Sequence, residues 1–156
     1  LLTALAKLNY PHVHLALAGD GPLREEMEKL TTQLGIDNQV HFLGFRTDIP
    51  TLIRAANAVL LVSQQEGLPR CIMEAMCLET PVIGTNIRGT QDLLEDGCGL
   101  LVNLGDVDEL AQAMAKIVDD PENAAIIAQK GLAKMADYDI EKIIVQYTDI
   151  YNLALA

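Results

Sequence analysis

Residues 58–77 constrain the possible folds more than any other part of the sequence. The run 58–62 is entirely apolar, and a short apolar run bounded by polar residues predicts a buried β-strand. A polar loop follows and ends in Gly67, Leu68 and Pro69. Pro69 suits the first position of a helix, because it has no N–H group to leave unpaired there. The segment therefore predicts a strand, a loop and a helix, in that order.

This arrangement also predicts an anion-binding site. The helix would begin in the crevice above the C-terminal end of the strand, so its free N–H groups and the positive end of its dipole would point into that crevice. Gly67 would let the main chain approach a ligand closely. We therefore expect a phosphate group to bind here.

Two carboxylates flank this point. Glu66 lies in the loop and Glu74 lies five residues beyond Pro69, roughly 7.5 Å along a helix axis at about 1.5 Å per residue. Glu74 interrupts an apolar run, and an acid among apolar neighbours is costly unless it has a partner, such as the two hydroxyls of a sugar or ribose. The simpler alternative is that Glu74 pairs with Arg70 one turn earlier and that Glu66 is a solvated loop acid. Spacing alone leaves both interpretations open.

Short apolar runs alternate with helical segments along the whole chain. This alternation predicts a three-layer α/β domain of the Rossmann-like type, in which helices cover both faces of a parallel sheet and ligands bind at the C-terminal ends of the strands. We expect one domain over residues 1–156. The expected strands cover residues 13–18, 40–46, 58–62, 81–84 and 100–102. The expected helices cover residues 1–8 and 23–34, one segment ending near residue 55, one beginning at residue 69, and residues 106–118, 122–136 and 139–155.

The turn at residues 19–22 contains a Gly-x-Gly pattern. The pattern is similar to a dinucleotide-binding fingerprint, but Arg24 occupies the position of the third glycine, so an NAD site is weakly supported. Turn formation alone accounts for both glycines. Further along, Gly35 is expected to end the helix that follows this turn, and Asp48 to begin the next one as its N-cap.

Composition limits the partners. The 156 residues are 50% hydrophobic, enough for one core, and no apolar run approaches the roughly 20 residues of a membrane span. A net charge of −11 argues against a nucleic-acid partner. Three cysteines without a Cys-x-x-Cys pattern or a nearby histidine predict free thiols in a reducing cytoplasm rather than a metal site. The three histidines do not cluster in sequence and are expected to be structural.

The same negative charge conflicts with a phosphate site, which favours cations. Residues 1–8 have the pattern of an amphipathic helix without a cap or an initiator methionine. We therefore expect the sequence to be part of a longer protein, with the cations in an upstream segment.

Several motifs together resemble the donor-binding half of the retaining glycosyltransferases of family 4. They are Glu-Gly-Leu-Pro at 66–69, the spacing from Glu66 to Glu74, Thr-Pro-Val-Ile-Gly at 80–84 and Gly-Leu-Leu-Val at 99–102. The resemblance covers nearly the whole chain. It implies one half of a two-domain glycosyltransferase-B fold and the transfer of a sugar from a nucleotide-sugar, UDP-linked by preference, to a glycan or lipid-linked acceptor. It implies no metal and no cofactor besides the donor itself.

The resemblance also implies roles for residues of the loop and helix at 66–77. Glu66 would hold hydroxyls of the donor sugar, and Glu74 would bind the ribose diol. Gly67, Leu68 and Pro69 would present main-chain donors to the sugar and phosphate. Helix N–H groups and upstream cations would stabilise the leaving diphosphate, which assists attack on the same face of the sugar without a protein nucleophile.

Five further residues border the donor by the same resemblance. Gly21 would lie beside the sugar and phosphates, and Phe45 and Arg46 would border the base. Arg46 as an exposed residue at a strand end is an equal alternative. Arg88 and Gly89 stand where the commonest family pattern has two glycines, and a similar Arg-Gly form occurs in relatives that build exopolysaccharide or capsule. Arg88 would reach the diphosphate, unless it is a solvated loop residue.

Parts of the resembled enzyme lie outside this sequence. A strand and loop with an arginine and a lysine would precede residue 1, and before them an N-terminal domain that holds the acceptor. The chain alone is therefore expected to be inactive. In relatives the last helix crosses to the other domain, so Ile143, Ile144, Tyr147 and Tyr151 could instead support a dimer here. We expect a cytoplasmic location, with peripheral contact to the inner face of the membrane left open.

Two rival functions remain. A sugar-nucleotide epimerase shares the two-domain architecture, but it would need clustered acid–base residues that the sequence lacks. A catalytically silent scaffold that binds a nucleotide-sugar is the alternative without turnover.

Overall fold

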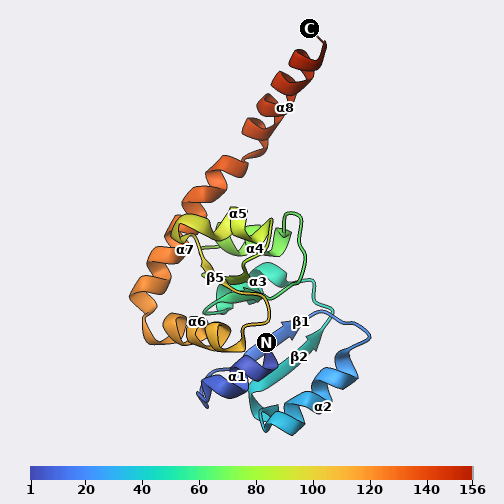
Figure 1. Cartoon of the computed structure of the whole chain (residues 1–156), viewed down its shortest axis with the longest axis vertical. Coiled ribbons are helices and arrows are strands. Elements are labelled where there is room, and N and C mark those ends of the chain that lie inside the picture. The colour runs from blue at the N-terminus through green and yellow to red at the C-terminus, as the bar shows by residue number, and fades with distance from the viewer. Residues whose placement is uncertain (156) are drawn as a thin grey trace.

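The computed structural model describes residues 1–155 as an α/β domain with a long C-terminal helix (Figure 1). The strands are β1 (Leu15–Ala18), β2 (Val40–Gly44), β3 (Val59–Leu61), β4 (Val82–Thr85) and β5 (Leu100–Val102). The helices are α1 (Leu2–Leu8), α2 (Arg24–Leu34), α3 (Ile49–Ala55), α4 (Arg70–Cys77), α5 (Thr90–Leu94), α6 (Val107–Asp119), α7 (Pro121–Met135) and α8 (Ile140–Leu155). Short 3-10 turns lie at η1 (Asp37–Gln39), η2 (Glu95–Gly97) and η3 (Ala136–Tyr138).

All strand pairs within residues 1–155 are parallel, which confirms the predicted fold class. The strands do not form one continuous sheet in this range. They form two hydrogen-bonded sheets, β1–β2 and β3–β4–β5. Both groups contribute to one apolar core, since Leu15 of β1, Val40 of β2 and Ile83 of β4 belong to the same buried cluster. Packing therefore joins the two sheets even though backbone hydrogen bonds do not.

The sequence predicts a buried strand at residues 58–62, and the strand is present but only half-buried. All three residues of β3 are half-buried, whereas all four residues of β4 are buried. β4 lies between two strands, while β3 is an outer strand of its sheet within the described residues. Its outer position explains why β3 is more exposed than its apolar sequence suggests.

Helix ends follow local signals closely. α2 ends at Gly35, which takes the left-handed conformation at φ 69 and satisfies the last carbonyls. α6 begins after Asp106, whose carboxylate accepts the N–H of Glu109 at 2.9 Å, a typical side-chain N-cap. α3 follows Asp48 as predicted, but the Asp48 carboxylate binds Arg46 instead of capping the helix.

A second apolar cluster anchors α4. Ile72 and Ala75 have no exposed surface and Met76 is 1% exposed, and all three pack with residues of α5 such as Leu93. Burial of a side chain the size of Ile72 or Met76 stabilises the fold by about 1.5–3 kcal/mol. The start of α4, where the sequence predicts a ligand, is therefore held by a rigid core.

Helix α8 extends away from the rest of the domain (Figure 1). Ile144, Tyr147 and Tyr151 on this helix are 57–66% exposed, and Ile143 is half-buried. This exposure agrees with the expected apolar surface, and dimerisation through it stays a prediction. Among residues 1–155, no helix combines the length and the apolar content that a membrane crossing requires.

Candidate functional site

The start of α4 forms the centre of the candidate site. Pro69 is buried and precedes the helix with φ −71 and ψ 109, so the helix begins at Arg70, one residue later than predicted. The N–H groups of Ile72 and Met73 bond to the Pro69 carbonyl. The N–H groups of Arg70 and Cys71 belong to the first turn of the helix, so their hydrogen-bond acceptors must lie outside the helix. Proline has no N–H, so the expected main-chain donor at Pro69 is wrong, and Pro69 acts by fixing the backbone.

Two loops meet in front of this helix. Gly89 has φ 84, and a Cβ on it would collide with the carbonyl oxygen of Gly67 and lie 3.1 Å from that of Glu66. Only glycine allows this approach without a shift of the backbone. The buried Thr85 also joins the ends of β4 and β3, because its hydroxyl donates to the Ser63 carbonyl at 2.6 Å. The structure thus brings the loop at 66–69 and the loop at 88–89 together.

Glu74 does not have the environment that the sequence suggested. Its side chain is 45% exposed and one carboxylate oxygen lies 3.7 Å from Arg70 Nη2. The helix turns Ile72 and Met76 into the core and Glu74 away from it. The argument from the cost of burying this acid is therefore wrong, and the simpler alternative, a pair with Arg70, describes the contact that the structure shows. A ribose contact for Glu74 stays a prediction.

Cys71 lies close to both acids of the motif. Burial raises the pKa of its thiol, and repulsion from Glu66 and then from Glu74 adds a smaller upward contribution. The thiol therefore stays protonated near neutral pH. Glu66 itself is half-buried, which suits a carboxylate that meets a ligand at the edge of the protein.

Two arginines provide positive charge at the helix start. The side chain of Arg70 is 89% exposed and makes a loose pair with Glu74. Arg88 is exposed in the loop that Gly89 holds against Gly67. Both side chains have room to turn toward an anion at the start of α4. An exposed Arg88 also agrees with the alternative of a solvated loop residue.

The predicted base-binding residues lie at the ends of β1 and β2, beyond Gly44. Phe45 is 83% exposed. Arg46 binds Asp48 with Nε–Oδ1 and Nη2–Oδ2 distances of 2.8 and 2.6 Å. This bidentate hydrogen bonding raises the pKa of Arg46 and lowers that of Asp48. The Arg46 side chain is thus already engaged with Asp48, and contact of its main chain with a base stays a prediction.

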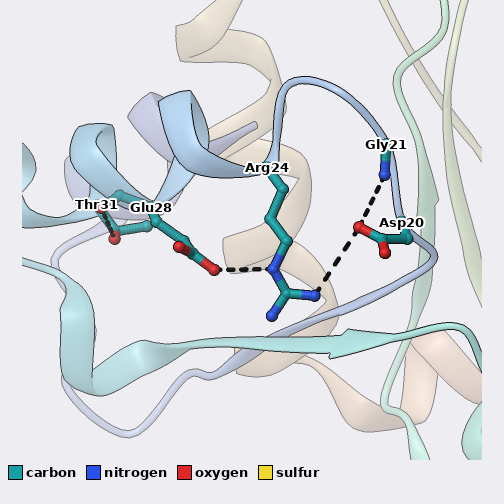
Figure 2. Close-up of polar contacts among 5 residues, drawn as sticks. All are labelled: Asp20, Gly21, Arg24, Glu28 and Thr31. Carbon is teal, nitrogen blue, oxygen red and sulfur yellow. Dashed lines mark hydrogen bonds and ion pairs between the residues drawn. The ribbon is translucent and has the colours of Figure 1, made fainter.

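Sequence reasoning gave Arg24 no functional role. Figure 2 shows its guanidinium between Asp20 and Glu28, next to the turn that holds Gly21. Gly21 is exposed, and its N–H donates to the Asp20 carboxylate at 3.0 Å. The spacing of four residues on each side of Arg24 was a signal for these contacts.

Two cavities of the domain, of about 290 and 390 Å³, lie away from the start of α4, one beside Lys7 and Asp108 and one beside Glu141 on α8. Within residues 1–155, no three His, Cys, Asp or Glu side chains come together as metal ligands. His14, just before β1, has its Nδ1 3.0 Å from Nε2 of His41 on β2, and the structural role of the histidines stays a prediction.

Comparison with known proteins decides the family. Residues 1–134 match the family described as "Glycosyl transferases group 1". The chain belongs to the group 1 glycosyl transferases. Among solved structures, the chain is similar to HepE of Anabaena, crystallised in complex with UDP, with 32% identity and a TM-score of 0.86 over 100% of this chain and 44% of HepE.

Two curated relatives are also similar. The lipopolysaccharide core biosynthesis glycosyltransferase LpsE of Rhizobium meliloti is 36% identical over 84% of this chain and 38% of LpsE. The UDP-Gal:alpha-D-GlcNAc-diphosphoundecaprenol alpha-1,3-galactosyltransferase of Escherichia coli is 31% identical over 70% of this chain and 29% of that enzyme. The chain therefore spans less than half the length of each of these relatives.

Proposed function

We propose that this chain is the donor-binding domain of a retaining glycosyltransferase of family 4, with a UDP-sugar as donor. The observation that carries the proposal is the contact of Gly89 with Gly67 in front of α4. It brings two loops and a helix start to one point at the C-terminal ends of β3 and β4, where parallel α/β sheets bind ligands. HepE, similar over the whole chain, was crystallised with UDP and with UDP-glucose, which supports the choice of donor.

The diphosphate would be bound by main-chain donors and by two arginines. The N–H groups of Gly67, Leu68, Arg70 and Cys71 surround the start of α4, where the helix dipole favours negative charge. Arg70 and Arg88 are exposed there and supply cations that a chain of net charge −11 otherwise lacks at this point. Together these groups stabilise the charge that develops on the leaving diphosphate. No metal is needed for this step.

The sugar and the ribose would each be bound by an acid. Glu66, in the loop before α4, would accept hydrogen bonds from hydroxyls of the donor sugar. Glu74 would release its loose pair with Arg70 and accept two hydrogen bonds from the ribose diol. This exchange costs little free energy, because an exposed ion pair contributes only about 0–1 kcal/mol to stability. At the other end, the main chain of Phe45 and Arg46 would border the base, with Gly21 near the phosphates.

The proposed stereochemistry and acceptor rest on the relatives. The galactosyltransferase relative is named for an alpha-1,3 linkage made from UDP-Gal to a diphosphoundecaprenol-linked sugar. UDP-galactose carries its sugar through an α bond, so an α product corresponds to retention. We propose the same outcome here, by attack on the face of the departing diphosphate, with a glycan or lipid-linked acceptor of exopolysaccharide or capsule type. The acceptor would be held by another domain of a longer cytoplasmic protein, and this chain alone would be inactive.

The proposal is tested by titrating UDP into the complete protein and into its Glu74→Ala variant. Loss of a charged hydrogen-bond acceptor should weaken binding at least tenfold, about 1.4 kcal/mol or more. Glu122→Ala is the matched control, because Glu122 is an exposed acid on α7 away from the site, and it should leave the affinity unchanged. Equal affinities for wild type and Glu74→Ala would remove Glu74 from the site.

Turnover assays separate the rival functions. A transferase consumes UDP-sugar only when an acceptor is present, apart from slow hydrolysis. An epimerase would convert UDP-sugar to its epimer without acceptor. A silent scaffold would bind UDP and transfer nothing with any acceptor tested.

A further inference from the structure

Two glycine turns lie next to each other at the C-terminal ends of β1 and β2. The N–H of Gly19 donates a 2.8 Å hydrogen bond to the carbonyl oxygen of Gly44, and the two residues form an antiparallel bridge beyond the parallel strands. Gly44 has φ 64, a conformation that favours glycine. The next residues are Phe45 and Arg46, proposed above to border the base. The two turns therefore form one backbone unit, which leads into the residues proposed to border the base and also carries Gly21, proposed to lie near the phosphates.

Arg24 holds the first of these turns (Figure 2). Its Nη1 lies 4.0 Å from Asp20 Oδ1, and the same Asp20 oxygen accepts the N–H of Gly21 at 3.0 Å. On the other side, Arg24 Nε donates to Glu28 Oε1 at 2.9 Å, one turn further along α2. An acid on each side thus fixes the guanidinium between the turn and the helix.

Arg24 also contacts the second turn. Its guanidinium carbon lies 5.8 Å from the centroid of the Phe42 ring on β2, within the range of a cation–π contact. A Cβ on Gly44 would lie 3.6 Å from Arg24 Nη1, so the guanidinium lies beside Gly44 on the side where a side chain would project. One side chain therefore touches both glycine turns, through Asp20 on one and Gly44 on the other.

We infer that Arg24 is a positioning residue for the nucleobase end of the donor site. By connecting the turn at Asp20 to Gly44, it fixes the main chain that leads into Phe45 and Arg46. This inference rests on the proposed function, because it assigns the base of the donor to that end. A planar guanidinium is required, since the compact ammonium of lysine cannot meet two acids while a flat face covers Phe42. A role limited to the stability of α2 would need only the pair with Glu28.

The test measures nucleotide preference in the complete protein. Calorimetric titrations of UDP and ADP should show that Arg24→Met binds the preferred nucleotide at least fivefold more weakly and discriminates less between the two bases. Arg24→Lys should recover only part of the preference. In turnover assays, Arg24→Met should raise KM for the donor and leave kcat unchanged.

Two variants serve as controls. Glu28→Gln removes the charge of the pair within α2, although its amide oxygen still accepts from Arg24 Nε, and it keeps the contacts with Asp20, Phe42 and Gly44. It should therefore keep most of the nucleotide preference. Lys29→Met removes an exposed cation from the same helix and should resemble wild type.

The possible results separate the inference from the proposed function. The inference is overturned if Arg24→Met lowers the melting temperature but keeps the UDP to ADP ratio and KM, or if both nucleotides lose affinity by one common factor. It is also overturned if Glu28→Gln reproduces the whole effect. If wild type binds neither nucleotide, the proposed function fails as well.

Discussion

At the scale of single residues, Gly89 is the residue of the candidate site that we expect to tolerate substitution least. Its left-handed φ and the contact with the Gly67 carbonyl each require glycine. Arg24 was assigned from the sequence only as the residue that breaks a dinucleotide pattern. Glu74 shows the limit of sequence inference, because the apolar run around it gave no information on which way the helix is rotated. Ile72, Ala75 and Met76 define the buried face of α4, and Glu74 falls outside it.

Gly89→Ala should therefore disrupt donor binding. We expect at least a tenfold loss of UDP affinity in titration calorimetry, because the Cβ forces the two loops apart. Gly105→Ala is the control, since Gly105 has nearly the same φ of 80 but a Cβ there would meet no atom of residues 1–155 within 4 Å. Both variants place an alanine at a positive φ, so the comparison separates most of the effect of the collision from that of the unfavourable φ. Similar UDP affinities for the two variants would contradict the loop contact.

Cys71 provides a chemical probe of the same point. Because burial raises the pKa of its thiol, less thiolate is present at pH 8 than for an ordinary cysteine, and alkylation should be slow and should accelerate as the pH rises further. Cys77 at the other end of α4 is exposed and should react faster. Mass spectrometry of iodoacetamide-treated protein should also show that UDP protects Cys71 and not Cys77. Equal protection of both cysteines, or of neither, would place the nucleotide elsewhere.

At the scale of elements, the boundaries of four helices were predicted well, whereas α5 was missed and the environments of the strands were not predicted. α2, α3, α6 and α7 begin and end within about one residue of prediction, because glycine, proline and aspartate at helix ends act on their own backbone. The exposure of β3 depends on which strands lie beside it, and no residue of Val59–Leu61 encodes that. The division into two sheets was missed for the same reason.

The packing of α4 gives a prediction at this scale. Met76→Ala should destabilise the fold by about 2–5 kcal/mol, because Met76 is 1% exposed and its loss leaves a cavity under the site helix. Met73→Ala on the same helix should cost less, since Met73 is half-buried. Chemical denaturation of the two variants compares the free energies of unfolding. Equal losses would mean that α4 is not anchored through the face that carries Ile72 and Met76.

At the scale of the whole molecule, the fold class and the membership of the glycosyltransferases followed from the sequence, whereas the apolar surface of α8 has no assigned partner. The motifs at 66–84 and 99–102 predicted a glycosyltransferase, and the match to the group 1 glycosyl transferases confirms this. Ile144, Tyr147 and Tyr151 are exposed on a helix that extends from the domain. If this surface drives self-association of the chain, sedimentation velocity should show a concentration-dependent dimer that Tyr151→Glu abolishes. A monomer at all concentrations would contradict the dimer prediction.

A crystal structure of the complete protein with UDP tests the central claim most directly. We predict diphosphate oxygens at hydrogen-bond distance, about 3 Å, from the N–H groups of Arg70 and Cys71, with the loops of Gly67 and Gly89 on either side. A UDP molecule bound away from the start of α4, with those N–H groups facing solvent, would contradict it.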